Sequence, residues 1–326
     1  MPTLDQTLWV ERHRPETLDD IVGHDPVVKR MKDFVDDPAM PNLLFAGKQG
    51  IGKTAVIQGF AKEKYGENWR NSILELNASD ARGIDIVRDE IKSFARQGTT
   101  DLADFKIIFL DEADQLTRDA QPALRRIMED YDDRTRFILS CNYPNQIIDP
   151  IQSRCAIFRM SALTDSQIKQ VLENVVGVEN VDADEDALLH IIAEARGDAR
   201  KAINTLQACV VDNQITELET REIIGEVDDE LIQGIVEDSI SGNLDDAIKR
   251  LDVEVLKRGI NPNRVVESAE RAIQNSNLPP DAEMKAYDVI GDADWRIRRG
   301  ANPHIQLHRM LAALLIARHA GMEPYE

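Results

Sequence analysis

The 326-residue sequence has few cysteines, few aromatic residues and no long apolar run. Its three cysteines, Cys141, Cys155 and Cys209, are widely spaced and form no C-x-x-C pair, which argues against a disulfide framework and against a zinc site. No stretch approaches the roughly 18 apolar residues that a membrane span needs. The opening residues also lack the basic-then-apolar layout of a signal peptide. We therefore expect a protein of the reducing cytoplasm with no membrane partner.

The charge is one-sided, because 59 acidic residues face 39 lysines and arginines, giving a formal net charge of −20. An acidic chain repels nucleic acid at long range, so this charge alone argues against DNA binding. Our hypothesis is a heavily solvated surface suited to a salty cell interior, where salt screens the self-repulsion. A hydrophobic content of 42% with only 5% aromatic residues indicates aliphatic cores, and the length predicts two or three domains.

The first two-thirds of the chain alternates short apolar runs with amphipathic stretches, which is typical of βαβ units and a parallel sheet. The predicted strands are residues 43–46, 73–76, 106–110, 136–140 and 156–158. Apolar residues recur with helical spacing over 84–96 and predict a helix there. From Thr164 onward we expect only helices, with a break near 225–228. The apolar side of the last predicted helix, 306–319, would pack into a core or contact a neighbouring subunit.

Residues 47–54 match the phosphate-binding pattern G-x-x-x-x-G-K-[ST] between a predicted strand and a predicted helix. Glycines let backbone N–H groups turn inward around a phosphate, and the helix start adds its dipole. We expect Lys53 to reach the β- and γ-phosphates and the Thr54 hydroxyl to bind Mg²⁺. The predicted ATP-binding residues of this loop are Gly47, Lys48, Gln49, Gly50, Ile51, Gly52, Lys53, Thr54 and Ala55.

Two adjacent carboxylates follow the apolar run that ends at Leu110. In α/β sheets, sites lie at the carboxyl ends of strands. We expect Asp111 to hold Mg²⁺ through water, and Glu112 to act as the general base that polarises the attacking water. Asp114 is predicted to be a solvated or helix-capping carboxylate rather than a third catalytic group.

Further motifs along the chain resemble those of one family. They are W-V-E-R-H-R-P at 9–15, E-L-N-A-S-D at 75–80, D-E-A-D at 111–114, Q-P-A-L-R-R at 121–126, S-R-C at 153–155, G-D-A-R at 197–200 and G-A-N-P at 300–303. Together they span nearly the whole chain, and S-R-C with D-E-A-D is much more specific than the phosphate loop. The sequence resembles the small subunits of archaeal-type replication factor C, which are clamp loaders of the AAA+ ATPase class.

This resemblance implies an α/β fold in three domains: an AAA+ parallel-sheet core with a P-loop over 1–160, a small helical lid over 161–226 and an all-α collar over 227–326. It implies an ATPase, with ATP and Mg²⁺ as cofactors, that opens a sliding clamp and loads it onto primed DNA during replication. The implied partners are a large subunit and other small subunits in a pentameric ring, the sliding clamp and primer–template DNA.

The resemblance also implies roles for matching positions in the ATP site. Val10 and Arg14 would line the adenine end of the pocket. Asn142 would be the sensor that positions the attacking water, and Arg200 would touch the γ-phosphate from the lid. Arg154 would be an arginine finger in the neighbouring subunit's site, an effect worth about 10³-fold or more in other NTPases. Simpler alternatives stay open: Asn142 could cap a turn, Arg200 could pair with a lid carboxylate, and Arg154 could lie in a solvated loop.

An acidic clamp loader needs a local concentration of basic residues to hold DNA. Arg88, Lys92 and Arg96 recur every four residues and would share one helix face, which could follow phosphates without reading sequence. The alternative is that they form salt bridges with acidic neighbours on a solvated helix. The predicted DNA-binding residues are Arg82, Arg88, Lys92, Arg96, Arg125 and Arg126.

The sequence departs from the family pattern in two places. Lys48 and Gln49 stand where proline or small residues are usual, and His13 stands where tyrosine is usual. Neither change removes a phosphate or metal ligand, so ATP binding is expected while the rate of turnover is left open. Two alternatives therefore stand beside a clamp-loading ATPase: a ring subunit that binds nucleotide but barely hydrolyses it, and another AAA+ ATPase such as a helicase or remodeller.

Overall fold

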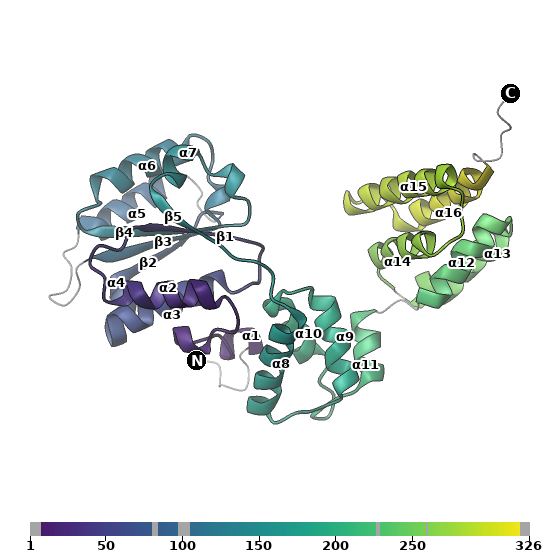
Figure 1. Ribbon diagram of the computed structural model, residues 1–326, viewed down its shortest axis with the longest axis horizontal. Helices are drawn as coiled ribbons and strands as arrows, with labels where there is room; N and C mark the ends of the chain where they lie inside the picture. The colour runs from purple at the N-terminus through teal and green to yellow at the C-terminus, as the bar shows by residue number, and fades with distance from the viewer. Residues whose placement is uncertain (1–7, 80–83, 97–104, 226–228, 259, 320–326) are drawn as a thin grey trace. The chain divides into compact units, whose positions relative to one another are not determined.

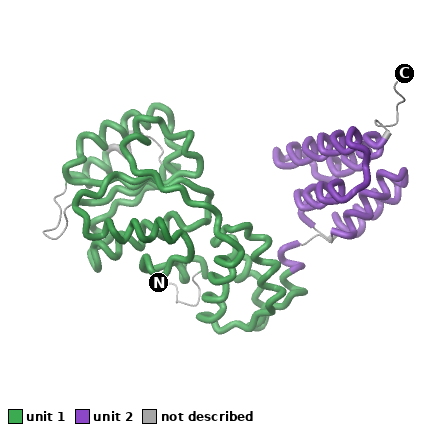
Figure 2. Tube along the Cα trace, viewed as in Figure 1, with its two compact units in different colours: residues 1–220 green, residues 221–326 purple. Residues whose placement is uncertain are grey.

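The chain folds as two compact units, residues 1–220 and 221–326 (Figure 2). The computed structural model describes residues 8–79, 84–96, 105–225, 229–258 and 260–319. Within these ranges, no helix is long and apolar enough to cross a membrane. Each unit has a hydrophobic core of its own.

A five-stranded sheet forms the centre of the first unit, in the order β2-β3-β4-β1-β5 (Figure 1). Its strands are β1 (Asn42–Ala46), β2 (Ile73–Asn77), β3 (Lys106–Asp111), β4 (Thr135–Cys141) and β5 (Cys155–Arg159). All pairings are parallel, so the five predicted strands and the predicted sheet type are confirmed. Leu110 lies opposite Leu139, and Ala46 lies opposite Cys141. This register places the carboxyl ends of β1, β3 and β4 side by side.

Helices cover both faces of the sheet, with α2, α3 and α4 on one and α5, α6 and α7 on the other (Figure 1). Their bounds are α2 (Asp25–Val35), α3 (Lys53–Tyr65), α4 (Trp69–Ser72), α5 (Ile84–Arg96), α6 (Ala120–Asp130) and α7 (Asp149–Gln152). Successive strand residues point to opposite faces. Leu43 and Phe45 therefore join the core under α2 and α3, while Leu44 and Ala46 join the core under α5 and α6. The helix predicted over 84–96 is confirmed as α5.

Short 3₁₀ turns connect these layers: η2 (Leu18–Asp20), η3 (Gly66–Asn68), η4 (Ala113–Gln115) and η5 (Pro144–Gln146). The turn η4 follows β3 directly, and η5 follows β4. Both therefore lie at the edge of the sheet where the strands end, which is the edge that carries the predicted ATP site.

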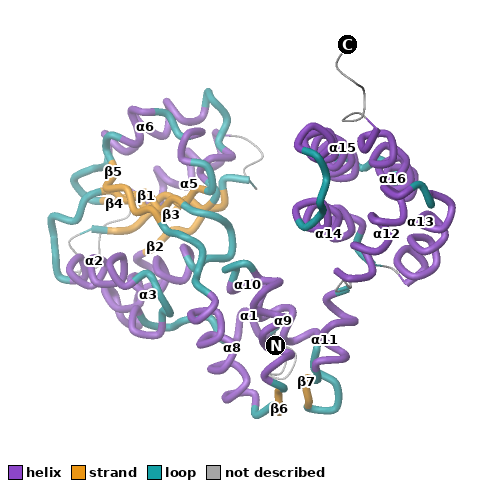
Figure 3. The backbone as a smooth tube through the Cα atoms, turned by 45° about the vertical axis from the view of Figure 1, so that its right-hand side comes forward, coloured by secondary structure: helices purple, strands orange, loops and turns teal. Residues whose placement is uncertain are grey.

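Helices of the lid complete the first unit: α8 (Asp165–Glu179), α9 (Glu185–Ala195), α10 (Ala199–Ala208) and the beginning of α11 (Glu217–Ile224). Thr164 caps α8, because its hydroxyl accepts from the Gln167 N–H at 3.3 Å and the Gln167 side chain accepts from the Thr164 N–H at 2.9 Å. The expectation of helices only was wrong in one detail. β6 (Asp182–Ala183) and β7 (Gln214–Ile215) pair as a short parallel ribbon (Figure 3), and strands of two residues are too short to show an alternating pattern.

Helices alone make up the described part of the second unit. They are α12 (Asp229–Ser241), α13 (Leu244–Arg250), the π-helix η6 (Leu251–Val255), the 3₁₀ turn η7 (Leu256–Arg258), α14 (Pro262–Gln274), α15 (Pro280–Arg298) and α16 (Pro303–His319). Leu307, Leu311 and Leu314 of α16 are buried in a core that includes residues of α12, α14 and α15. The apolar side of the last helix therefore packs within its own unit.

Candidate nucleotide site

The phosphate loop joins the end of β1 to the start of α3, and glycine is required at both of its ends. The Gly47 N–H donates to the Cys141 carbonyl at 3.1 Å, and a side chain at Gly47 would place Cβ 2.4 Å from the Met160 carbonyl oxygen. Gly52 precedes α3 with φ +100°, a conformation that only glycine adopts easily. These constraints fix the path of the loop along the sheet edge.

Gly50, in the middle of the loop, contacts the lid directly. Its φ is +77°, and an added Cβ would lie 1.9 Å from an Asp198 carboxylate oxygen. The Ala199 N–H donates to the Gly50 carbonyl at 3.1 Å. Asp198 also caps α10 by accepting from the Lys201 N–H at 2.9 Å. The start of α10 is thereby held against the loop, a contact that sequence reasoning missed because Asp198 lies almost 150 residues from Gly50.

Lys53 is buried with its ammonium group turned back onto the loop. Nζ donates to the Gly47 carbonyl at 2.6 Å, to the Lys48 carbonyl at 2.7 Å and to Asn142 Oδ1 at 3.1 Å. Burial lowers the pKa of Lys53, and the nearby Asp111 carboxylate opposes that shift. An anionic phosphate oxygen is a stronger acceptor for an ammonium than a neutral carbonyl is. Lys53 is thus positioned to exchange carbonyl partners for phosphate.

Asp111 forms the centre of the predicted Mg²⁺ site. One carboxylate oxygen accepts from the Thr54 hydroxyl at 3.2 Å. The other accepts from the Ser140 hydroxyl and from the Glu112 N–H, the latter at 3.0 Å. Oxygen donors of this kind fit a hard cation such as Mg²⁺. Sequence reasoning missed Ser140, although its place near the end of the strand next to β3 is a signal that could have identified it.

Glu112 has an unusual backbone conformation, with φ +53°. Glutamate rarely adopts the left-handed region, and such outliers cluster at functional sites. Among the described residues, the Glu112 carboxylate has no hydrogen-bonding partner, and the residue lines the pocket described below. The carboxylate is therefore available to accept a proton from water.

The prediction of a solvated or helix-capping Asp114 was wrong. Its side chain is 5% exposed, and one carboxylate oxygen accepts from the Asn142 N–H at 3.1 Å and from the Tyr143 N–H at 3.0 Å. The turn η4 carries Asp114 from the end of β3 toward the end of β4, which explains its burial. Burial and, secondarily, the Asp114 charge raise the pKa of the nearby Cys141 thiol to about 11. Asp114 is a positioning residue for Asn142.

The N-terminal helix α1 (Trp9–Arg12) is fixed to the lid by polar contacts. The Trp9 N–H donates to the Gln207 side chain at 3.0 Å. Arg12 donates to both carboxylate oxygens of Glu179 at 2.8 Å. The His13 Nε2 atom lies 2.6 Å from the same carboxylate. His13, at the tyrosine position of the family pattern, thus helps to hold the segment that carries Val10 and Arg14.

A single pocket gathers most of the predicted site residues. It is lined by Val10, His13, Arg14, Pro15, Gln49, Gly50, Gly52, Lys53, Thr54, Ala55, Asp111, Glu112, Ser140, Cys141, Asn142, Ala199, Arg200 and Ile203. Arg200 is exposed and has no ion-pair partner among the described residues, which disfavours its pairing with a lid carboxylate. Gly47, Lys48 and Ile51 do not line the pocket: the Lys48 side chain is exposed, and Ile51 is buried in the core under α2 and α3. The ATP-binding roles predicted for the pocket residues and for the three residues outside the pocket stay predictions.

Arg154 does not line this pocket. It follows α7, is partly exposed, and donates to the Pro150 carbonyl at 2.7 Å. Its other terminal nitrogen pairs with Glu129 of α6. This placement away from its own chain's pocket agrees with the predicted role in a neighbouring subunit, which stays a prediction.

Five of the six predicted DNA-binding residues fall on two helices that contact each other on one side of the sheet, α5 and α6. Arg82 and the Arg88 side chain lie outside the described residues. Within the described part of α5, Lys92 and Arg96 form no ion pair with Asp89 or Glu90, which disfavours the salt-bridge alternative for these two.

The basic residues of α6 complete the predicted set. Arg125 Nε lies 3.8 Å from Glu129. Arg126 is exposed and has no ion-pair partner among the described residues. DNA binding by either residue stays a prediction.

Comparisons with known proteins match this architecture. Family profiles match in chain order: "ATPase family associated with various cellular activities (AAA)" over 43–163, "RCF1/5-like, AAA+ ATPase lid domain" over 170–211 and "Replication factor C C-terminal domain" over 227–313. Solved structures of Thermotoga maritima RuvB, a Holliday junction branch migration motor, share the fold at 18% identity and a TM-score of 0.55, covering 79% of this chain and 91% of that chain. Fold and site together define an AAA+ ATPase.

Curated relatives identify the family within that class. A replication factor C small subunit from Natronomonas pharaonis is 44% identical over 308 residues, covering 94% of both chains. Those of Haloarcula marismortui and Archaeoglobus fulgidus are 43% and 42% identical, over 95% and 94% of this chain and 95% and 97% of theirs. The chain belongs to the replication factor C small-subunit family. The resemblance seen in the motifs, and the fold class it implied, are confirmed.

Proposed function

We propose that this chain uses ATP and Mg²⁺ to open a sliding clamp and load it onto primed DNA. Family membership supports the coarser statement that it is an AAA+ ATPase subunit of a replication clamp loader. The observation that carries the proposal is the convergence of Lys53, Thr54, Asp111, Glu112 and Asn142 on one pocket. These groups come from the phosphate loop and from the ends of β3 and β4, and hydrogen bonds hold most of them in place.

Each of these residues has a distinct task. Lys53 binds the β- and γ-phosphates in place of the loop carbonyls it now contacts. Thr54 and Asp111 supply oxygens for Mg²⁺, which when bound neutralises charge on the phosphates. Glu112 takes a proton from the attacking water. Asn142 orients that water, and its backbone N–H is held by a hydrogen bond to the Asp114 carboxylate.

The site is completed between subunits. Arg200 reaches the γ-phosphate from the chain's own lid, whereas Arg154 acts in the site of an adjacent subunit. The working unit is then a ring that this chain forms with a large subunit and other small subunits. Basic side chains of α5 and α6 hold the DNA backbone. The overall negative charge then repels DNA only from the rest of the surface. The three predicted domains, 1–160, 161–226 and 227–326, belong to this proposal.

Substitution of the proposed general base tests the proposal. In the assembled complex with clamp and primed DNA, Glu112→Gln should lower ATP hydrolysis by about 10²- to 10⁴-fold, while ATP binding measured by calorimetry stays near wild type. Glu173→Gln, an exposed lid carboxylate outside the pocket, is the matched control and should hydrolyse ATP normally. Equal rates for Glu112→Gln and wild type would refute the assignment.

A second candidate, a subunit that binds ATP but barely hydrolyses it, is favoured by Lys48 and Gln49. Both side chains are exposed, and of the two only Gln49 lines the pocket. If the wild-type complex binds an ATP analogue but shows no turnover with clamp and DNA, this candidate replaces the first. DNA-stimulated ATPase that needs no clamp would instead indicate another kind of AAA+ motor.

A further inference from the structure

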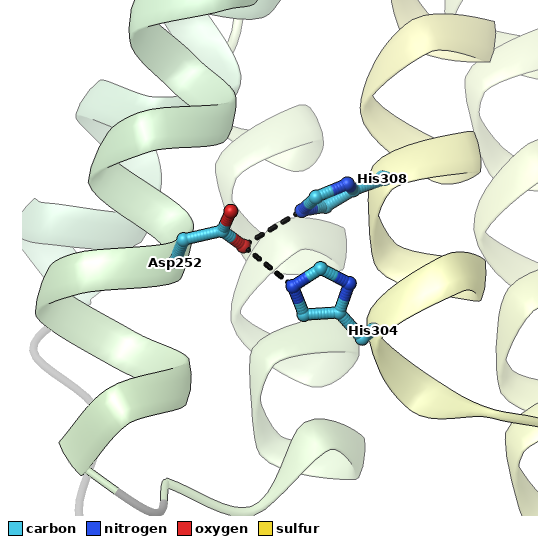
Figure 4. A group of neighbouring side chains, drawn as sticks. All are labelled: Asp252, His304 and His308. Atoms are coloured by element: carbon cyan, nitrogen blue, oxygen red, sulfur yellow. Dashed lines mark hydrogen bonds and ion pairs between the residues drawn. The ribbon is translucent and has the colours of Figure 1, made fainter.

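Two histidines of α16 meet an aspartate of the π-helix η6 on the second unit (Figure 4). His308 Nε2 lies 2.7 Å from Asp252 Oδ1, and His304 Nε2 lies 3.0 Å from the same oxygen. The two imidazole rings are neighbours, with centroids 4.2 Å apart. One ligand atom from each of the three residues lies within 4.8 Å of the others. Three groups that can bind a metal therefore face a common point.

The local backbone explains this convergence. His304 and His308 are four residues apart on α16, so their side chains share one helix face. Asp252 approaches from a different element, a π-helix, which is a rare conformation that often occurs at functional sites. The site therefore joins parts of the second unit that lie more than 50 residues apart in sequence.

The chemistry of the three groups selects the kind of metal. Two imidazoles with one carboxylate suit Zn²⁺ and similar ions, whereas Mg²⁺ and Ca²⁺ prefer oxygen ligands throughout. Tetrahedral Zn²⁺ with ligands at 2.0–2.2 Å places its ligand atoms about 3.3 Å apart. The present Nε2–Oδ1 separations of 2.7 and 3.0 Å therefore need to open by about 0.6 and 0.3 Å. The ligand atoms of the two histidines, which lie within 4.8 Å of each other, need to reach the same spacing, and side-chain rotation can provide both adjustments.

Solvent can reach the cluster. The side chains of His304, Asp252 and His308 are 53%, 32% and 26% exposed. An ion can therefore enter without unfolding the unit, and water can fill its remaining coordination position.

We propose that Asp252, His304 and His308 bind a divalent transition-metal ion of the zinc type. The ion replaces the two hydrogen bonds to Asp252 and clamps η6 to α16, the helix whose leucines fill the core of the second unit. Binding requires neutral imidazoles, so affinity falls on acidification. The site lies in the second unit and does not depend on the proposed ATPase function.

Zinc titration of the metal-free full-length chain, without nucleotide or Mg²⁺, tests this site by calorimetry. Wild type should bind one zinc ion. His304→Gln and His308→Gln should each lower the zinc affinity by more than about 100-fold, because even loss of an outer partner of a metal ligand lowers metal affinity by about 10- to 100-fold. His190→Gln is the matched control. That histidine is 25% exposed and lies 3.5 Å from a carboxylate of Glu217 in the first unit, and its replacement should leave zinc binding unchanged.

Thermal unfolding provides a second readout. Zinc should raise the unfolding midpoint of wild type and His190→Gln but not that of the two site variants. Because His304 is the most exposed of the three residues, His304→Gln tests the site even if His308→Gln disturbs packing. Equal zinc affinity in wild type and His304→Gln, or no zinc binding by wild type, would overturn the proposal.

Discussion

The two units of this chain organise their polar groups differently. The first has a core on each side of a parallel sheet, and its polar side chains gather where β1, β3 and β4 end. The second has one described core among helices, and the polar cluster of Asp252, His304 and His308 lies partly exposed on that core's outer side. A sheet edge thus gathers chemical groups into a pocket, whereas packed helices bring them together on a surface. We expect substitutions at the pocket of the first unit to change ATP chemistry, and substitutions in the second unit to change stability without changing ATP binding.

The largest expected effect, at Arg154, tests whether the first unit's chemistry is complete within one chain. Arg154→Ala should reduce ATPase activity of the assembled complex by about 10³-fold or more. ATP binding by the isolated chain should not change, because Arg154 does not line its own pocket. Arg134→Ala, an exposed arginine paired with Asp133, is the control and should retain activity. Loss of ATP binding by isolated Arg154→Ala would instead place this residue in its own chain's site.

Paired core substitutions test whether the two units are independent. Leu311→Ala in the second unit and Leu139→Ala in the first each remove a buried side chain, at a cost of about 2–5 kcal/mol. Leu311→Ala should lower the unfolding temperature of the second unit while ATP binding is retained, and Leu139→Ala should impair ATP binding. Differential scanning calorimetry with and without ATP measures both. If Leu311→Ala abolishes ATP binding as well, the two units are coupled and not independent.

A smaller effect should follow from loss of the Asp114 carboxylate, which accepts two backbone N–H groups. Asp114→Ala should destabilise the first unit by about 2–3 kcal/mol, since a buried hydrogen bond to a charged group is worth about 1.5–3 kcal/mol and part of the loss is recovered by relaxation. It should also slow hydrolysis through a displaced Asn142. Asp119→Ala, an exposed residue that makes no capping bond, should change neither denaturation nor rate.

The smallest effect is a pH dependence of the first unit. His24 Nε2 donates to the Ile51 carbonyl at 3.0 Å, and burial lowers the pKa of His24 from its usual 6.5. As the pH falls below about 6.5, His24 is therefore protonated in the unfolded chain before it is protonated in the folded chain. Stability should decrease from there down to the folded-state pKa, by at most about 1.4 kcal/mol per pH unit.

His24→Asn isolates that contribution in urea denaturation at pH 7 and 5.5. Asparagine tolerates the left-handed backbone that His24 adopts, with φ +57°. The variant should lose less stability on acidification than wild type does. An identical loss in both proteins would exclude His24 as the group responsible.

Much of the first unit could be predicted because its signals are local. Each strand is a short apolar run, and the phosphate loop is eight consecutive residues. The positions of Lys53, Thr54 and Asp111 in one pocket then follow from the order of a parallel sheet.

What could not be predicted depends on turns and distant contacts. Burial of Asp114 depends on the short turn η4, and Ser140 contacts Asp111 only through strand register. The same limit hid the cluster in the second unit. The cysteine spacing bears only on cysteine-rich zinc sites, and no local pattern links Asp252 to His304 and His308.

The contact between Gly50 and Asp198 has a mechanical consequence. Asp198 caps α10, and Arg200 is the second residue of that helix. Because the Ala199 N–H donates to the Gly50 carbonyl, which joins the helix to the loop backbone to backbone, a displacement of a few tenths of an ångström at the loop cannot be absorbed by side-chain rotation alone. It has to tilt α10. Glycine at position 50 thus keeps the loop in direct contact with the start of α10, and we expect phosphate binding at the loop to shift the helix that carries Arg200.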